Sequence, residues 1–172
     1  MRDRLALWGP ASGPGLLTAV VIFAIDQAYK AVMLYGLDFK ALGPEAYIRV
    51  TSFFDLRMVW NPGVSYGLFA QDTEAGRWML VIFNVVASLG LVLWLARQHK
   101  GWDAFAIGLV IGGALGNALD RALYGAVADF FSLHAFGYYW YVFNIADVAI
   151  VLGVLMMLID AFRPARAPAE DR

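Results

Sequence analysis

Long apolar runs, each interrupted by a few polar residues, dominate the chain. Four runs are long enough for a membrane-spanning helix, which needs about 20 mostly apolar residues at ~1.5 Å rise each. They cover about residues 16–37, 78–95, 104–123 and 141–162, and a polar, Pro/Ala-rich tail follows at 163–172. The pattern predicts an all-α integral membrane protein, with four transmembrane helices in a single domain, 1–172, and a cytoplasmic tail.

The stretch between the first two spans, about residues 38–77, has a different pattern. Over residues 47–60, β-branched and aromatic residues interleave with Arg49, Thr51 and Arg57. This alternation is typical of β-strands, and the Asn61-Pro62-Gly63 sequence is a turn signal. We therefore expect a small β element on the outer membrane surface, between spans one and two.

Composition and charge exclude several classes of protein. The chain has 172 residues, of which 61% are hydrophobic and 16% charged, an excess of apolar residues over a soluble domain of this size. A net charge of -1 provides no field to attract nucleic acid. With no cysteine and two histidines, neither a disulfide framework nor a Cys- or His-rich metal site is expected.

Basic residues beside the span ends predict the orientation in the membrane, because they favour the cytoplasmic side. Seven Lys and Arg residues fall on the side of the two termini, against five on the other side. Four of the seven, Arg97, Lys100, Arg163 and Arg166, lie directly beside span ends. Both termini are therefore predicted to be cytoplasmic.

The polar residues of the spans gather at one depth. If the spans are antiparallel, all of these positions lie near the outer face: Asp26, Gln27, Lys30, Asn84, Asn117, Asp120, Arg121, Asn144 and Asp147. Polar groups inside a span mark a functional site or a buried pair. The spacing of four places Asp26 and Lys30 on one helix face, where they can form an ion pair. Gly108, Gly112 and Gly116 repeat every four residues and predict close helix packing.

Two acidic residues are candidates for a catalytic pair. Asp129 is a lone acid in an apolar run after the third span, and Asp147 is expected about two turns into the fourth. A short connection between these spans can bring both carboxylates together at the outer interface. Two such groups share a proton, so one can act as base on a water and the other as acid toward a peptide carbonyl. The alternative is that these are structural aspartates, paired with Lys30 or Arg121.

Three other functions remain open at this stage. A serine–lysine peptidase would use Ser65 or Ser52 as nucleophile and Lys30 as base. A proton- or cation-coupled transporter would use the intramembrane carboxylates along a path through the membrane. A non-catalytic assembly protein would tolerate replacement of both Asp129 and Asp147.

Five fragments together resemble one known family. They are DQAYK at 26–30, NPGVSYG at 61–67, GGALGNALDR at 112–121, VADF at 127–130 and FNIAD at 143–147. Their order and the four spans resemble the lipoprotein signal peptidases, the signal peptidase II family of bacterial inner membranes. Tyr29, the Val64-Ser65-Tyr66 segment and Ala128 depart from the residues usual in that family.

The resemblance implies an aspartic endopeptidase that needs no cofactor and no metal. Its substrate would be a diacylglyceryl-modified prolipoprotein, cut just before the lipidated cysteine, and its surroundings membrane lipid. Asp129 and Asp147 match the catalytic pair, and supporting or substrate-binding roles fall on Asp26, Lys30, Asn61, Gly63, Asn117, Asp120, Arg121 and Asn144. The enzyme is expected to be a monomer in the bacterial inner membrane, with the site toward the periplasm and the loop at 60–69 helping to cover the substrate.

Overall fold

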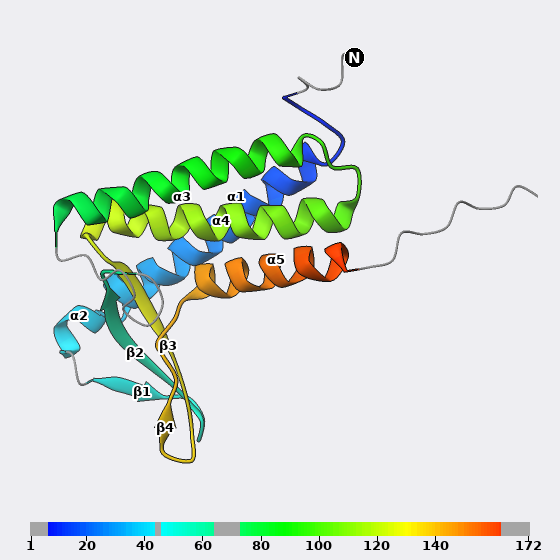
Figure 1. Cartoon of the computed structure of the whole chain (residues 1–172). Helices are drawn as coiled ribbons and strands as arrows, with labels where there is room; N and C mark the ends of the chain where they lie inside the picture. The colour runs from blue at the N-terminus through cyan, green and yellow to red at the C-terminus, as the bar shows by residue number, and fades with distance from the viewer. Residues whose placement is uncertain (1–6, 44–45, 64–72, 163–172) are drawn as a thin grey trace, which may run out of the picture.

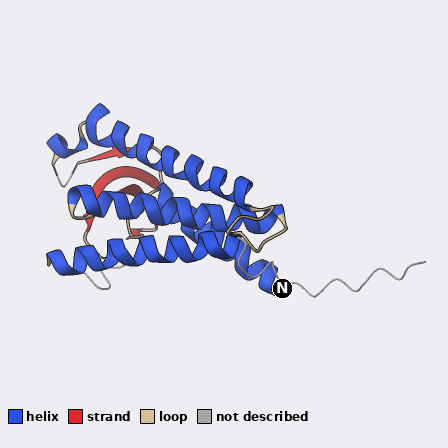
Figure 2. Cartoon of the chain, turned by 90° about the horizontal axis from the view of Figure 1, so that it is seen from above, coloured by secondary structure: helices blue, strands red, loops and turns tan. Residues whose placement is uncertain are grey.

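The chain folds into a helical bundle with a small sheet at one end (Figure 1). The structure is a computed structural model that describes residues 7–43, 46–63 and 73–162. Its helices are α1 (Ser12–Ala31), continued by the π-helical turn η2 (Val32–Gly36), α2 (Phe39–Leu42), α3 (Glu74–Leu95), α4 (Gly101–Tyr124) and α5 (Ile145–Ala161). Seen from above, the strands gather at one end of the long helices (Figure 2). Residues 64–69 of the predicted loop at 60–69, and the predicted tail at 163–172, lie outside the described residues.

Three of the described helices are long and apolar enough to cross a membrane: Ser12–Gly36, Glu74–Leu95 and Gly101–Tyr124. α4 is the central helix: 67% of its most apolar 18-residue stretch is buried, against 22% for the span that contains α1 and 17% for α3. The fourth helix, α5, has 17 residues, a length of about 26 Å. The chain is therefore a mostly helical integral membrane protein.

Glycines let the helices pack closely around α4, as the repeat in the sequence predicts. A Cβ on Gly112 would lie 2.6 Å from the carbonyl oxygen of Ala19 on α1. A Cβ on Gly113 would lie 2.5 Å from the carbonyl oxygen of Ala146 on α5. Because only a residue without a side chain fits at these positions, the glycines bring α1 and α5 into backbone contact with α4.

The sheet is larger than predicted. Its four antiparallel strands run in the order β1 (Tyr47–Arg49), β2 (Phe54–Asn61), β3 (Val127–Ala135) and β4 (Tyr138–Tyr139). The prediction placed the β element only between the first two spans, but half of the strands come from the chain between α4 and α5. That chain is a strand and a hairpin rather than a short connection, because β3 pairs along the full length of β2.

The start of α5, the helix predicted as the fourth span, also differs from the prediction. α5 begins at Ile145 rather than near residue 141, because the backbone of Phe143 is paired with Phe131 of β3. The Phe143 N–H donates to the Phe131 oxygen at 3.1 Å, and the Phe131 N–H donates back at 2.8 Å. Asp147 consequently lies in the first turn of α5, not two turns into it.

An apolar cluster joins the sheet to the end of α1. Met33 and Leu34 of η2, Phe39 of α2, and Ala128 and Phe130 of β3 are all buried together. Side chains alternate along a strand, so Phe130 faces this cluster while its neighbour Asp129 faces the other side of the sheet. The packing of β3 thus fixes the direction in which Asp129 points.

Candidate active site

Asp129 and Asp147 come from different elements that meet where the sheet joins the bundle. Asp129 lies on β3 and is 1% exposed. Asp147 is the third residue of α5, and Asn144 caps that helix. The Asn144 side chain accepts from the Asp147 N–H at 2.9 Å, and the Asp147 carboxylate accepts from the Asn144 N–H at 3.3 Å. This capping box orients the Asp147 carboxylate at the start of the helix.

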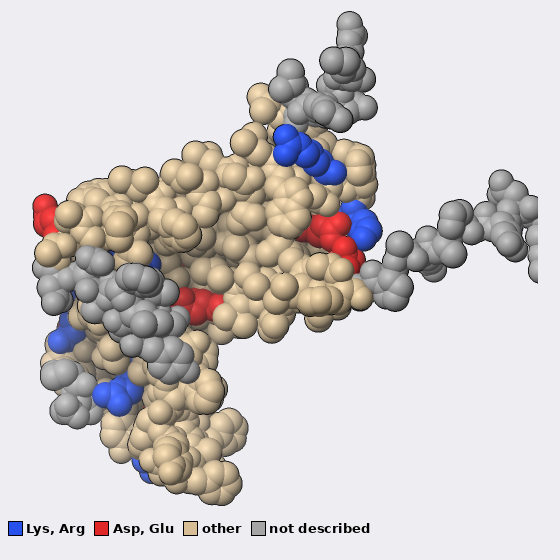
Figure 3. All heavy atoms as spheres, in the orientation of Figure 1, with Lys and Arg blue, Asp and Glu red and all other residues tan. Residues whose placement is uncertain are grey.

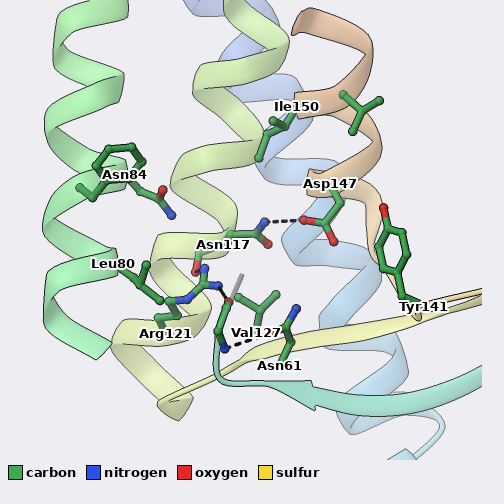
Figure 4. Close-up of a pocket in the computed structure, with 12 residues that line it drawn as sticks. Asn61, Leu80, Asn84, Asn117, Arg121, Val127, Tyr141, Asp147 and Ile150 are labelled. Carbon is green, nitrogen blue, oxygen red and sulfur yellow. Dashed lines mark hydrogen bonds between the residues drawn. The ribbon is translucent and has the colours of Figure 1, made fainter. Parts of the chain in front are cut away.

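Three asparagines hold the two carboxylates, and two of them, Asn144 and Asn117, connect one carboxylate to the other. Asn144 Nδ2 donates to Asp129 Oδ1 at 2.5 Å, and also to Asn117 Oδ1 at 3.2 Å. Asn117 Nδ2, from α4, donates to Asp147 Oδ1 at 2.8 Å (Figure 4). Asn61 Nδ2, at the end of β2, donates to Asp129 Oδ2 at 3.1 Å. Every amide nitrogen of this set is a neutral donor to a carboxylate oxygen, so the pair is held without a cation.

A cavity of about 230 Å³ opens beside Asp147. It lies between α3, α4 and α5, and Figure 4 shows Asn84, Asn117, Arg121 and Asp147 around it. Its apolar walls are Leu80, Phe83, Val127, Ile150 and Val151, and its other lining residues are Asn61, Gly63 and Tyr141. A polar floor with apolar walls suits an extended, largely apolar peptide.

Arg121 holds the chain at the end of β2. Its guanidinium donates from Nη2 to the carbonyl oxygen of Gly63 and from Nη1 to that of Asn117, the latter at 3.4 Å. The Gly63 N–H in turn donates to Asn61 Oδ1 at 3.1 Å. Arg121 therefore fixes the turn that carries Asn61, and its buried charge lies at the cavity.

A second polar cluster, formed by Asp26, Lys30 and Asp120, adjoins the cluster of Asp129, Asp147 and their asparagines. Lys30 Nζ lies 2.8 Å from a carboxylate oxygen of Asp26 and 2.8 Å from one of Asp120, and all three residues are almost fully buried. This confirms the ion pair predicted from the spacing of Asp26 and Lys30, and adds Asp120 as a second partner. Lys30 Nζ also lies 3.5 Å from Asn117 Oδ1, which links this cluster to the asparagines.

The second cluster ties four elements together. Asp26 Oδ1 on α1 accepts from the Ala146 N–H in the first turn of α5 at 3.0 Å. Asp120 Oδ2 on α4 accepts from the Ala128 N–H of β3 at 3.1 Å. Gln27 Nε2 donates to both carboxylates, each at 3.1 Å. The cluster therefore sets the positions of the backbone next to Asp129 and next to Asp147.

Burial changes the protonation of Asp129. Burial and, after it, the nearby charge of Asp147 raise the pKa of this carboxyl to about 7, although the hydrogen bonds from Asn144 and Asn61 and the charge of Lys30 lower it. A carboxyl with this pKa both gains and loses a proton near neutral pH. That is the property required of a group that shares one proton with its partner.

The alternative that Asp129 and Asp147 are structural aspartates requires ion pairs with Lys30 or Arg121, and these pairs are not formed among the described residues. Lys30 pairs instead with Asp26 and Asp120, and within the described residues neither Asp129 nor Asp147 forms an ion pair. The same arrangement argues against Lys30 as the base of a serine–lysine peptidase, since two carboxylates hold its ammonium. Of the two serines considered for that role, Ser52 is exposed outside the strands of the sheet and Ser65 lies outside the described residues.

All ten residues predicted for the site belong to these two clusters. The structure adds Gln27, Asn84 and Tyr141, which were not assigned to the site. Gln27 and Asn84 were detectable, because both are amides at the same depth in their spans. Tyr141 carried no such signal, since it was taken as the start of a span. Within the described residues, no three His, Cys, Asp or Glu side chains are arranged to hold a metal ion.

Comparison of the sequence with known proteins identifies the family. Residues 18–163 match the family model described as signal peptidase (SPase) II. The chain belongs to the signal peptidase II family. It is 49% identical over 158 residues to a lipoprotein signal peptidase of Methylorubrum extorquens, covering 91% of both chains. It is 47% identical over 157 residues to the lipoprotein signal peptidase of Rhodopseudomonas palustris strain TIE-1, covering 89% of this chain and 94% of the relative.

The fold agrees with that family assignment. A bacterial membrane enzyme solved by the in meso method superimposes with a TM-score of 0.77 at 26% identity, covering 93% of this chain and 94% of the other. The resemblance that the five sequence fragments indicated is thereby confirmed, and this signal peptidase II homologue is a membrane-embedded peptidase. The transporter alternative has no support among these relatives.

Proposed function

We propose that this signal peptidase II homologue removes the signal peptide from diacylglyceryl-modified prolipoproteins, by cutting just before the lipidated cysteine. The observation that carries the proposal is the pair Asp129 and Asp147, a buried and a partly buried carboxylate that are held by asparagine amides, with Asp147 on the cavity. The names of the relatives supply the substrate class.

The catalytic step uses one proton on the pair. The ionised carboxylate takes a proton from a water molecule, whose oxygen adds to the scissile carbonyl carbon. The protonated carboxyl gives its proton to the carbonyl oxygen, and a tetrahedral diol forms. When the diol collapses, one of its hydroxyls gives its proton to the ionised carboxylate, the protonated carboxyl gives its proton to the cysteine nitrogen, and the C–N bond breaks, so the pair again carries one proton.

The remaining site residues position this pair. Asn117 and Asn144 keep the two carboxylates in register, and Asn61, with Gly63 and Arg121 behind it, orients Asp129 and one end of the cavity. Asp26, Lys30 and Asp120 fix the backbone of β3 and α5 from behind. We assign these eight residues supporting roles, which place the carboxylates before substrate arrives.

The position of the sheet relative to the two chain ends supports a membrane arrangement. The described start of α1 and the end of α5 both lie at the end of the bundle away from the sheet (Figure 1). We propose four spans, with α5 as the fourth, both termini in the cytoplasm and the sheet at the periplasmic face of the bacterial inner membrane. The enzyme acts as a monomeric single domain. Because its site lies at the membrane face, the lipid chains of the substrate stay in the bilayer while the peptide enters beside Asp147.

A cleavage assay with matched substrates tests this function. Purified enzyme in detergent is given one prolipoprotein with and without its diacylglyceryl group, together with a version in which serine replaces the lipobox cysteine. We expect cleavage of the lipidated form alone, and mass spectrometry should place the lipidated cysteine at the new N-terminus. Equal cleavage of the unmodified form, or a cut elsewhere, would overturn the substrate assignment.

A further inference from the structure

A second cavity lies on the opposite face of the sheet from Asp129. It has a volume of about 640 Å³ and lies between α2 and β2. Its apolar lining includes Phe39, Met58 and Trp60. Trp60 and its neighbour Asn61 point to opposite faces, since Asn61 contacts Asp129 while Trp60 lies beside Lys40. This cavity is therefore separate from the catalytic one.

In the described part of the chain, the charged residues that line this cavity are both cations, Lys40 and Arg57. The Lys40 ammonium lies over three aromatic rings, 5.4 Å from that of Tyr35, 5.6 Å from that of Trp60 and 5.1 Å from that of Tyr124. Rings hold an ammonium in place without neutralising it. Neither Lys40 nor Arg57 forms an ion pair with a carboxylate in the described part of the chain. Among the described residues, no carboxylate therefore pairs with either positive charge, and we take both as available to an anion.

The surface beside this cavity is apolar and exposed. Val32 of η2, the adjoining Leu37, and Leu42 of α2 are each 48–57% exposed. Figure 3 shows basic atoms over the α2 and sheet end of the molecule, with uncharged surface beside them. A ligand that satisfies both features has an anionic head and apolar chains. An acidic peptide would satisfy only the cations.

We propose that this cavity binds the phosphate headgroup of an anionic phospholipid. The phosphate lies between Lys40 and Arg57, and the acyl chains run along the exposed apolar side of η2 and α2. The proposal rests on the membrane orientation given under the proposed function, in which the end of α1 lies at the outer interface, where lipid phosphates are found. It concerns no residue of the catalytic machinery.

Native mass spectrometry of the purified full chain tests this site. Enzyme is titrated with phosphatidylglycerol and, separately, with phosphatidylcholine. We expect the wild type to retain the anionic lipid preferentially, and the double variant Lys40→Gln/Arg57→Gln to lose at least about tenfold in that preference, because each basic residue near an anionic lipid contributes roughly fivefold. The matched control is Arg49→Gln on β1, whose side chain is 61% exposed and lies outside the cavity.

Three results would overturn the proposal. They are an unchanged preference in the double variant, an equal loss in Arg49→Gln, as general surface charge would produce, and displacement of the lipid by free glycerol phosphate, which would make the site one for soluble phosphate. The readout does not depend on catalysis, and Asp129→Asn enzyme should keep the full lipid preference. A failed cleavage assay therefore leaves this test intact.

Discussion

The site holds four carboxylates, of which all but Asp147 are fully buried, and their partners divide them into two kinds. Asp26 and Asp120 share the ammonium of Lys30, each at 2.8 Å. Within the described residues, the carboxylates of Asp129 and Asp147 accept hydrogen bonds from side-chain and backbone amides alone. A cation keeps a buried carboxylate ionised, whereas neutral donors leave it able to hold a proton. The first pair thus serves structure, and the second has the electrostatics that acid–base catalysis requires.

The pKa of Asp129, raised to about 7, predicts how activity depends on pH. Below that value the Asp129 carboxyl carries the proton that the pair donates to the substrate carbonyl, and above it Asp129 loses that proton. We therefore expect kcat/KM to fall about tenfold for each pH unit well above 7. Initial rates measured with lipidated substrate from pH 5 to about 9 would check this, and a rate that keeps rising to the alkaline end would contradict it.

The two buried ion pairs of Lys30 predict that its replacement lowers the free energy of unfolding substantially. Its replacement by Met leaves Asp26 and Asp120 buried side by side with no cation, which typically costs 3–5 kcal/mol. The control is Lys100→Met, which breaks the ion pair with Asp160, where the lysine side chain is 64% exposed. Pairs at such exposed positions contribute about 0–1 kcal/mol. Thermal unfolding in detergent should show a clear loss for the first variant only, and equal midpoints would refute the role given to Lys30.

At the scale of elements, the hydrophobic pattern predicted the helices better than the strands. α1, α3 and α4 coincide with the predicted spans within a few residues, since their length and composition are local properties. β3 could not be predicted, because its apolar sequence gives no period and its partner β2 is distant in the chain. The late start of α5 has the same cause, as Phe143 pairs with β3 before the helix begins.

The close approach of α1 and α4 predicts the effect of adding one methyl group. In Gly112→Ala the new Cβ would lie 2.6 Å from the Ala19 carbonyl oxygen, so the helices must separate, at a cost of about 1–3 kcal/mol. The matched control is Gly90→Ala on α3, where nothing lies within 4 Å and stability should be equal or slightly higher. Unfolding midpoints of the two variants check this, and a neutral Gly112→Ala would contradict the packing.

For the whole molecule, the common depth of the polar residues predicted the site. Asp26, Lys30, Asn117 and Asp120 were placed near one face from the direction of each span, and the structure brings them together there. The sequence could not show how they divide into two clusters, since that depends on which amide each oxygen meets. Nor could it explain Tyr29, whose ring packs 5.9 Å and 5.1 Å, centroid to centroid, from Phe130 and Phe131 on the strand that carries Asp129.

The proposed orientation can be tested with single cysteines, because the chain contains none. Tyr138→Cys places a thiol on β4, where the native side chain is 82% exposed, and His99→Cys places one at the exposed connection of α3 and α4. A membrane-impermeant maleimide added to spheroplasts should label the first variant alone, and both after permeabilisation. The reverse pattern would mean that the site faces the cytoplasm.

The most direct test of the account measures cleavage of lipidated prolipoprotein by Asp129→Asn and Asp147→Asn. Each variant retains the shape of the side chain but loses the proton exchange, so we expect both rates to fall by at least about 10²-fold. Asp160→Asn, at the other end of α5, serves as the control and should cleave at the wild-type rate. If either catalytic variant, folded as the wild type is, still cleaves at an undiminished rate, Asp129 and Asp147 do not form the catalytic pair.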